Sequence, residues 1–335
     1  MGPLVLDIEG TALTKDDVRR IADPLVGIVI LFTRNYRDRD QLTELCSAIH
    51  AVKPGLLIAV DHEGGRVQRF QEGFTKIPAM AKLGEKWIDE PENTLLSAMA
   101  CGYVMAAELR ACGVDFTFAP CLDINFGRSQ IIGERAFSNN PNVVTQLALA
   151  VIQGLRLAGM SNCGKHFPGH GWVIADSHLE LPVDDRPYDR LLFADLKPYR
   201  WMGQALDSVM AAHVVYPKVD SNPAGFSEHW LKKVLREELH FTGVVFSDDL
   251  SMKGAVGVGD VTQRAQAALQ AGCDMLIQCN DFEASDQLLG SLKFEDTAER
   301  AERVKRLSPK GEAPTWKELV ETSLYKRSKD LIPAV

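Results

Sequence analysis

Three histidines and an aspartate fall within one short segment that has the composition of a functional loop. The segment runs from Lys165 to His178 and reads KHFPGHGWVIADSH. Its glycines and proline indicate irregular backbone, and long irregular loops in compact domains are usually functional or disordered. Phe167 and Trp172 argue against disorder, because disordered segments contain few aromatic residues. Histidine has an ordinary pKa of about 6.5 and can donate and accept protons near neutrality, so the segment predicts acid–base chemistry.

Other reactive side chains follow several of the short apolar runs along the chain. Carboxylates beside arginine and lysine can pair with the vicinal hydroxyl groups of a polyhydroxylated ligand. We expect Arg69 rather than Arg66 to reach the ligand, and His170 to have a structural role. Rim positions are predicted for Asp123, His213 and Asn280. The polar positions at these run ends are Asp61–Arg69, Asp123, Asn125, Glu134, Arg135, Lys165, His166, His213, Asp248, Asp249, Asn280 and Asp281.

Cleavage of a glycosidic bond is one reaction that these residue types can perform. It needs a carboxylate nucleophile and a proton donor to the leaving oxygen. Asp248 ends an apolar run, where the packing of a buried strand would hold it rigidly. His178 is a candidate donor, and Asp176 is close enough in sequence to orient its ring and stabilise its charged form. Asp249 could equally be a helix cap, and Glu63 could be an acid on chemistry alone.

The elements that must position these residues alternate between short apolar runs and helical periodicity. The runs are apolar on both parities, which is typical of parallel strands covered on both faces. They are Pro3–Ile8, Gly27–Phe32, Leu57–Val60, Asp115–Ala119, Asn162–Lys165, Ser208–Ala212, Val244–Ser247 and Asp274–Cys279. The helical segments are Gln41–Val52, Thr94–Cys112, Val143–Ala158, Glu228–Leu239 and Gln263–Ala271.

This alternation predicts an α/β fold of the (β/α)₈ TIM-type barrel class in a single domain. We expect the catalytic barrel to span residues 1–294, with a charged C-terminal helix and tail over 295–335. An open doubly wound sheet is the alternative, although no GxGxxG motif opens an early helix. In a barrel, residues just past the carboxyl ends of the strands share one site.

Composition and net charge indicate which kinds of binding partner and which cellular compartment to expect. The formal net charge of -8 argues against nucleic acid and anionic membranes as partners. The start of the chain lacks a basic signal-like region, and no apolar run reaches the roughly 18 residues that a membrane span needs. The 7 cysteines include no CxxC pair, which favours reduced thiols. These features predict a cytoplasmic protein.

At these motifs the sequence resembles the β-N-acetylglucosaminidases of glycoside hydrolase family 3. The main motifs are KHFPGHG at Lys165–Gly171, DSH at Asp176–His178 and SDDLSM at Ser247–Met252. DHEGGRVQR at Asp61–Arg69 and IGERAF at Ile132–Phe137 are similar to two further signatures of the family. Several separate motifs that agree in the right order make the resemblance specific.

The resemblance implies a retaining β-N-acetylhexosaminidase in which Asp248 is the nucleophile, His178 is the general acid/base and Asp176 is its partner. The sugar hydroxyls would be held by Asp61, Arg69, Arg135, Lys165 and His166. The implied substrate is a 1,6-anhydro-muropeptide with a terminal non-reducing β-linked N-acetylglucosamine, as in cytoplasmic peptidoglycan recycling, with links to cell-wall biogenesis, cell shape and cell division. A monomer that uses no cofactor and no metal, and that binds neither nucleic acid nor membrane, is expected.

Three other functions stay open at the level of sequence. A metallohydrolase could use His62, His166, His178, His213 and Asp248 as zinc ligands, but there is no HxH or HExxH pair, and the lysine beside His166 would repel the ion. A non-catalytic sugar-binding protein could use the same rim. A glycosyl phosphorylase would keep the fold and the nucleophile, since a neutral histidine tolerates an approaching phosphate better than a carboxylate does.

Overall fold

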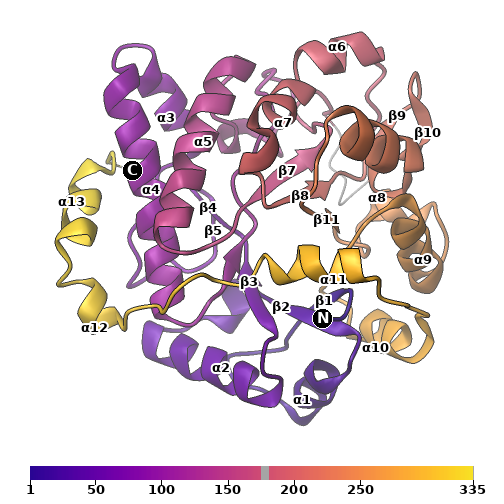
Figure 1. Ribbon diagram of the computed structural model, residues 1–335, viewed down its shortest axis with the longest axis horizontal. Coiled ribbons are helices and arrows are strands. Elements are labelled where there is room, and N and C mark those ends of the chain that lie inside the picture. The colour runs from indigo at the N-terminus through magenta and orange to yellow at the C-terminus, as the bar shows by residue number, and fades with distance from the viewer. Residues whose placement is uncertain (175–180, 335) are drawn as a thin grey trace.

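Parallel strands lie at each of the eight apolar runs that the sequence predicted (Figure 1). The computed structural model describes residues 1–174 and 181–334. Every residue of these strands is buried, which explains why the runs are apolar on both parities. The strands are β1 (Leu4–Asp7), β2 (Val26–Leu31), β3 (Leu57–Val60), β6 (Phe116–Thr117), β7 (Cys163–Phe167), β8 (Ser208–Ala211), β11 (Val244–Ser247) and β12 (Leu276–Gln278).

These strands form two parallel sheets, and the expectation of a closed (β/α)₈ barrel is wrong. One sheet has the order β12-β1-β2-β3-β6 and the other the order β11-β8-β7. Within the described residues the β-bridges between them are isolated ones, Cys121 to Lys165 at one edge and Phe246 to Met275 at the other. Beside β6, which ends at Thr117, backbone hydrogen bonds to β7 continue irregularly, from the N–H of Cys163 to Ala119, of Lys165 to Pro120 and of Leu122 to Lys165. The fold is therefore a single α/β domain with two parallel sheets.

Helices surround the two sheets (Figure 1). The five predicted helical segments are confirmed as α2, α4, α5, η5 and α9. Gly113 and Gly272 follow α4 and α9 with φ of +88° and +122°, as expected of C-terminal caps. The helices are α1 (Lys15–Ala22), α2 (Arg39–Val52), α3 (Met80–Trp87), α4 (Pro91–Ala111), α5 (Pro141–Leu157), α6 (Tyr188–Phe193), α7 (Leu196–Met202), the π-helix η5 (His229–Glu238), α8 (Lys253–Val256), α9 (Val261–Ala271), α10 (Phe282–Ser291), α11 (Ala298–Lys305), α12 (Trp316–Leu319) and α13 (Ser323–Leu331).

Side chains from the strands of both sheets form a second buried core, separate from the core between the strands and the helices. Phe116, Phe118 and Phe246 form its aromatic centre, with ring centroids 5.2 to 5.8 Å apart. Val304 of α11 and Leu307 just beyond it pack into the same core. The charged segment after residue 294 thus contributes apolar side chains to the interior. A boundary at residue 294 remains a prediction.

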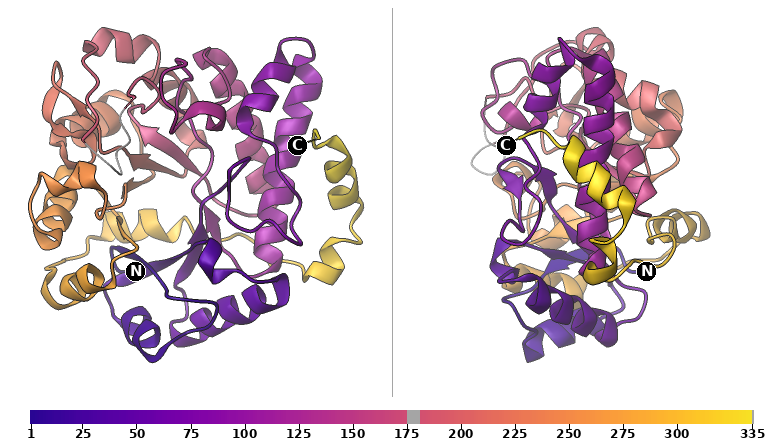
Figure 2. Two further views of the ribbon diagram at one scale, coloured as in Figure 1. Left: turned by 180° about the vertical axis from the view of Figure 1, so that it is seen from behind. Right: turned by 90° about the vertical axis from the view of Figure 1, so that its left-hand side faces the viewer.

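The last two helices lie against the outside of α4 (Figure 2). Tyr325 of α13 donates a hydrogen bond of 2.6 Å to the buried carboxylate of Glu108 on α4. Glu108 also accepts from the backbone N–H and the hydroxyl of Thr75, so α13 is linked through Glu108 to the segment after strand β5 (Val67–Gln68). Among the described helices, none is both long and apolar enough to cross a membrane.

Two short antiparallel hairpins follow the ends of two of the parallel strands. The first pairs β4 (His62–Gly64) with β5 (Val67–Gln68) directly after β3. The second pairs β9 (Val215–Tyr216) with β10 (Asp220–Pro223) after β8. The sequence did not predict either hairpin, because runs of two to four residues give too little periodicity to recognise.

Candidate active site

One cavity at the carboxyl ends of the parallel strands collects most of the predicted site residues. Its volume is about 610 Å³, and six predicted residues line it: Asp61, Arg69, Arg135, Lys165, His166 and Asp248. Asp176 and His178 lie outside the described residues. The remaining lining residues are Ile30, Phe32, Glu63, Arg66, Val67, Phe118, Ile131, Ile132, His170, Met210, Asp249, Ser251, Met252, Ile277, Cys279 and Asn280.

Lys165 is the centre of a chain of alternating charges along one wall of this cavity. Its Nζ lies 2.7 Å from Asp61 Oδ1 and 2.6 Å from Glu63 Oε1. Arg69 reaches the other oxygen of Asp61 at 3.4 Å. Burial alone would raise the pKa of Asp61, but Lys165 and Arg69 outweigh it and hold that pKa below its ordinary value. The wall therefore offers fixed cations and ionised carboxylates side by side.

Glu63 holds two cations together and is not available as a catalytic acid. Both its oxygens accept from Arg135, at 2.9 and 2.8 Å, while Oε1 also contacts Lys165. Burial would raise the pKa of Glu63, but Arg135 and Lys165 more than compensate and hold it well below its usual range. A carboxyl group in this state keeps no proton to donate at neutral pH. The alternative role considered for Glu63 is thereby excluded.

Replacing Glu63 should show how much the fold depends on this ion network. We expect Glu63→Gln to lower the free energy of unfolding by about 3 kcal/mol, because two buried cations lose a full negative charge. Urea denaturation at pH 7 measures it. Glu134→Gln is the matched control, since Glu134 is half exposed and lies 3.8 Å from Arg66; its effect should stay within about 0.5 kcal/mol. Equal small effects for both variants would contradict a structural role for Glu63.

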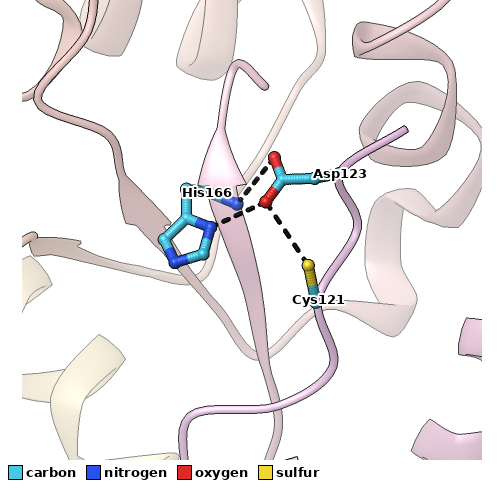
Figure 3. A group of neighbouring side chains, drawn as sticks. All are labelled: Cys121, Asp123 and His166. Atoms are coloured by element: carbon cyan, nitrogen blue, oxygen red, sulfur yellow. Dashed lines mark hydrogen bonds and ion pairs between the residues drawn. The ribbon is translucent and has the colours of Figure 1, made fainter. Parts of the chain in front are cut away.

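His166 is held by a buried carboxylate behind the cavity wall (Figure 3). Asp123 accepts from the His166 backbone N–H at 3.3 Å, lies 2.7 Å from His166 Nδ1, and accepts from the His170 N–H at 2.7 Å and the Cys121 thiol at 3.3 Å. Burial opposes ionisation, but His166 and His170 hold the pKa of Asp123 at about 2. Because the ionised carboxylate accepts from Nδ1, the ring carries a proton there. In the neutral ring, Nε2 then accepts from Arg135 Nη2, 3.4 Å away.

Cys121, Asp123 and His166 also have ligand atoms within 4.8 Å of one another, as in a metal site. Burial and the neighbouring Asp123 raise the pKa of the Cys121 thiol well above its ordinary value, so the thiol keeps its proton at neutral pH. The contacts match a hydrogen-bonded network in which each donor already has an acceptor. His62 and His213, two of the five candidate ligands of the metallohydrolase alternative, are buried and do not line the cavity.

The two adjacent aspartates after β11 have different surroundings. The backbone N–H of Asp248 donates to Ala211, and its Oδ1 accepts from the Asp249 N–H at 2.9 Å. Asp249 Oδ1 accepts from the backbone N–H groups of Ser251 and Cys279, at 3.0 and 3.2 Å. Burial raises the pKa of Asp249 to about 7. Asp249 Oδ1 is therefore used to close the backbone turn, and the assignment of Asp248 as the nucleophile remains a prediction.

The remaining sequence expectations have mixed outcomes. Asn280 lines the cavity, but Asp123 and His213 do not, so their predicted rim positions are wrong. Arg66 lines the cavity as Arg69 does, and it also lies 3.8 Å from Glu134 on another segment. His170 is buried, and it lines the cavity as well.

Sequence reasoning missed the apolar side of the cavity. Phe32, Phe118, Met210 and Ile277 line it from within or just after the parallel strands. Their signal was present, since each lies within or directly after a predicted strand. Which alternate residues of a strand face the cavity depends on the register of that strand, and the sequence alone did not give the register.

Known proteins resemble this chain over nearly its whole length. Residues 5–307 match the family model described as the glycosyl hydrolase family 3 N-terminal domain. A beta-hexosaminidase of Bordetella parapertussis is 54% identical over 333 residues, 98% of this chain and 94% of that protein. The crystal structure of native NagZ from Neisseria gonorrhoeae superposes with a TM-score of 0.93 at 44% identity, and covers 99% of this chain and 96% of that one. The same protein in complex with N-trifluoroacetyl-D-glucosamine gives a TM-score of 0.94 at 45% identity, with the same coverage.

Proposed function

Because the chain belongs to glycosyl hydrolase family 3 and is a glycoside hydrolase, we propose that it removes terminal non-reducing β-linked N-acetylglucosamine with retention of configuration. The observation that carries this proposal is the convergence of Asp248 and five predicted sugar-binding residues on one cavity of about 610 Å³. The amino-sugar preference is supported by relatives, one of them called a beta-hexosaminidase and another bound to N-trifluoroacetyl-D-glucosamine.

The charged wall has the chemistry to hold a sugar ring. Asp61 accepts hydrogen bonds from hydroxyl groups, while Lys165 and Arg69 donate to them, so neighbouring hydroxyls meet donors and acceptors in turn. His166 Nε2 and Arg135 Nη2 are 3.4 Å apart, so a sugar hydroxyl would replace this long contact by donating to Nε2 and accepting from Arg135. Because salt bridges fix these side chains before the sugar arrives, little conformational entropy is lost on binding.

Asp248 would attack the anomeric carbon while the leaving oxygen takes a proton from His178. This step forms a covalent glycosyl-enzyme on the Asp248 carboxylate and releases the aglycone alcohol. His178 would then accept a proton from a water molecule, which attacks the anomeric carbon and frees Asp248. Asp176 would orient the His178 ring and stabilise its charged form. The roles of His178 and Asp176 rest on the sequence motif.

The natural substrate that we propose is a 1,6-anhydro-muropeptide, in a cytoplasmic pathway that recycles peptidoglycan. The enzyme would act as a monomer without metal or cofactor. The resemblance of the KHFPGHG and DSH motifs to the single-domain family members supports this proposal.

Asp123→Asn should reduce activity through His166 without touching the sugar. The amide that replaces the carboxylate has an N–H₂ group, which would face either the His166 ring N–H or a backbone N–H. This contact favours the other imidazole tautomer of His166, in which Nδ1 accepts and Nε2 is a donor. We expect kcat/KM to fall about ten- to a hundredfold, the cost of one misplaced buried hydrogen bond. Nitrogen chemical shifts of His166 report the tautomer change. Lost activity with an unchanged tautomer would contradict this mechanism.

Product analysis tests the proposed reaction. We expect an aryl β-N-acetylglucosaminide to give β-configured N-acetylglucosamine first, seen by proton NMR before mutarotation. The rate and product should be the same with and without phosphate, and after exhaustive chelation. A sugar phosphate as product would favour a phosphorylase, and lost activity after chelation would favour a metal-dependent hydrolase.

A further inference from the structure

A second cavity lies beside the first at the same end of the parallel strands. Its volume is about 530 Å³, and its walls come from segments that follow β6, β7 and β8, represented by Phe126, Trp172 and Lys218. His170 lines the first cavity and Trp172 lines the second. Two residues of extended chain span at most about 7 Å, so the two cavities are close neighbours.

Cations dominate the polar lining of this second cavity. Arg186, Arg190 and Lys218 line it together with one carboxylate, that of Asp185. Arg190 and Lys218 are exposed, and neither forms an ion pair with any residue in 1–174 or 181–334. The chain as a whole has a formal net charge of -8, so a pocket with two unpaired cations stands out against its surroundings.

The inner wall of the pocket is rigid and leaves these cations available. The Arg186 guanidinium is neutralised from behind by the buried carboxylates of Asp184 and Asp195, at 2.6 and 2.8 Å. It also lies 4.7 Å from the centre of the Trp172 ring, and Arg128 lies 4.2 Å from that ring. Phe126 packs edge-on against Trp172 at 5.3 Å. Arg186 thus fixes the wall, while Arg190 and Lys218 are exposed and have no ion-pair partner in the part of the chain that the structure describes.

The pocket also has an apolar side. Phe193 lines it with 68% of its surface exposed, and Pro187 and Ala194 lie beside it. Phe193, Pro187 and Ala194 give the cavity an apolar surface in the same lining as Arg190 and Lys218. A ligand with carboxylates and small apolar groups would satisfy both sides at once.

We propose that this second cavity binds the acidic peptide part of the aglycone, with Arg190 and Lys218 pairing with its carboxylates and Phe193 contacting its methyl groups. The proposal rests on the proposed function, since it takes the substrate to be a glycoside that carries a peptide. It goes further by assigning the residues that select such a substrate over a simple glycoside. The sugar would bind in the first cavity and the peptide in the second.

The test compares two substrates with one double variant. The substrates are a chromogenic aryl β-N-acetylglucosaminide and an N-acetylglucosaminyl-anhydro-muramyl tetrapeptide. We expect Arg190→Ala/Lys218→Ala to lower kcat/KM for the tetrapeptide substrate about five- to tenfold, since each exposed charge contributes modestly, and to leave the aryl glycoside within about twofold. Added salt should weaken turnover of the tetrapeptide substrate in the wild type and have less effect in the variant.

Arg200→Ala/Lys233→Ala is the matched control, because both residues are exposed, lie outside the pocket and remove the same charge. Equal losses on both substrates, no loss on either, or a control that loses as much as the pocket variant would each overturn the proposal. Failure of the proposed function has a different signature, since wild-type protein would then release no N-acetylglucosamine from the aryl glycoside either.

Discussion

Asp248→Asn is expected to lower kcat by at least about 10⁴-fold on every substrate, because the amide cannot form the glycosyl-enzyme. The amide keeps the size of the side chain and can still accept from the Asp249 N–H, so the fold should survive. Steady-state kinetics with an aryl β-N-acetylglucosaminide give the loss. Circular dichroism and thermal unfolding show that the variant is folded.

Asp249→Asn is the matched control for this variant. Asp249 also lines the cavity, but its Oδ1 is used by the backbone N–H groups of Ser251 and Cys279. An asparagine oxygen can accept both bonds, so we expect a loss of about tenfold or less, the cost of one perturbed hydrogen bond. If the Asp249 variant were inactive while the Asp248 variant still turned over substrate, the nucleophile would be Asp249 and the assignment to Asp248 would be wrong.

His178→Ala should produce a loss that depends on the leaving group. A glycoside with a poor leaving group needs its oxygen protonated, so we expect kcat/KM to fall about 10²- to 10⁴-fold. An activated aryl glycoside hardly needs that proton, and its first step should be much less affected. A series of aryl glycosides with graded phenol pKa values measures the trend as the slope of log kcat/KM.

His229→Ala provides the matched control for the histidine series, because His229 is half-buried on η5 and lies outside the cavity lining. It should leave the slope unchanged. The acid role of His178 would be refuted by a uniform loss across the whole aryl series.

The sequence predicted the strands well because burial on both faces produces a strong local signal. Val244–Ser247 and Leu57–Val60 have the predicted bounds. The prediction of a closed barrel was wrong because closure depends on strand pairing at two sheet edges. No local sequence pattern indicates that β6 ends at Thr117.

Six of the predicted residues line one cavity, and each of them belongs to a motif that the sequence already displays, although their roles remain predictions. The role of Glu63 could not be predicted, since it depends on Lys165 and Arg135 reaching it from two distant segments. Asp123 was expected at the rim, yet it lies behind His166, because three donors from β7 and its loop turn its carboxylate inward. Such roles arise from tertiary contacts rather than from residue type or spacing.

The most direct test of the account is to trap the covalent intermediate. Wild-type protein would be incubated with a 5-fluoro glycoside of N-acetylglucosamine, which slows release of the sugar from the nucleophile. After digestion at low pH, mass spectrometry locates the labelled residue. The account predicts one added sugar per chain, attached to Asp248. A label on any other side chain, or turnover through an enzyme that never forms an adduct, would contradict it.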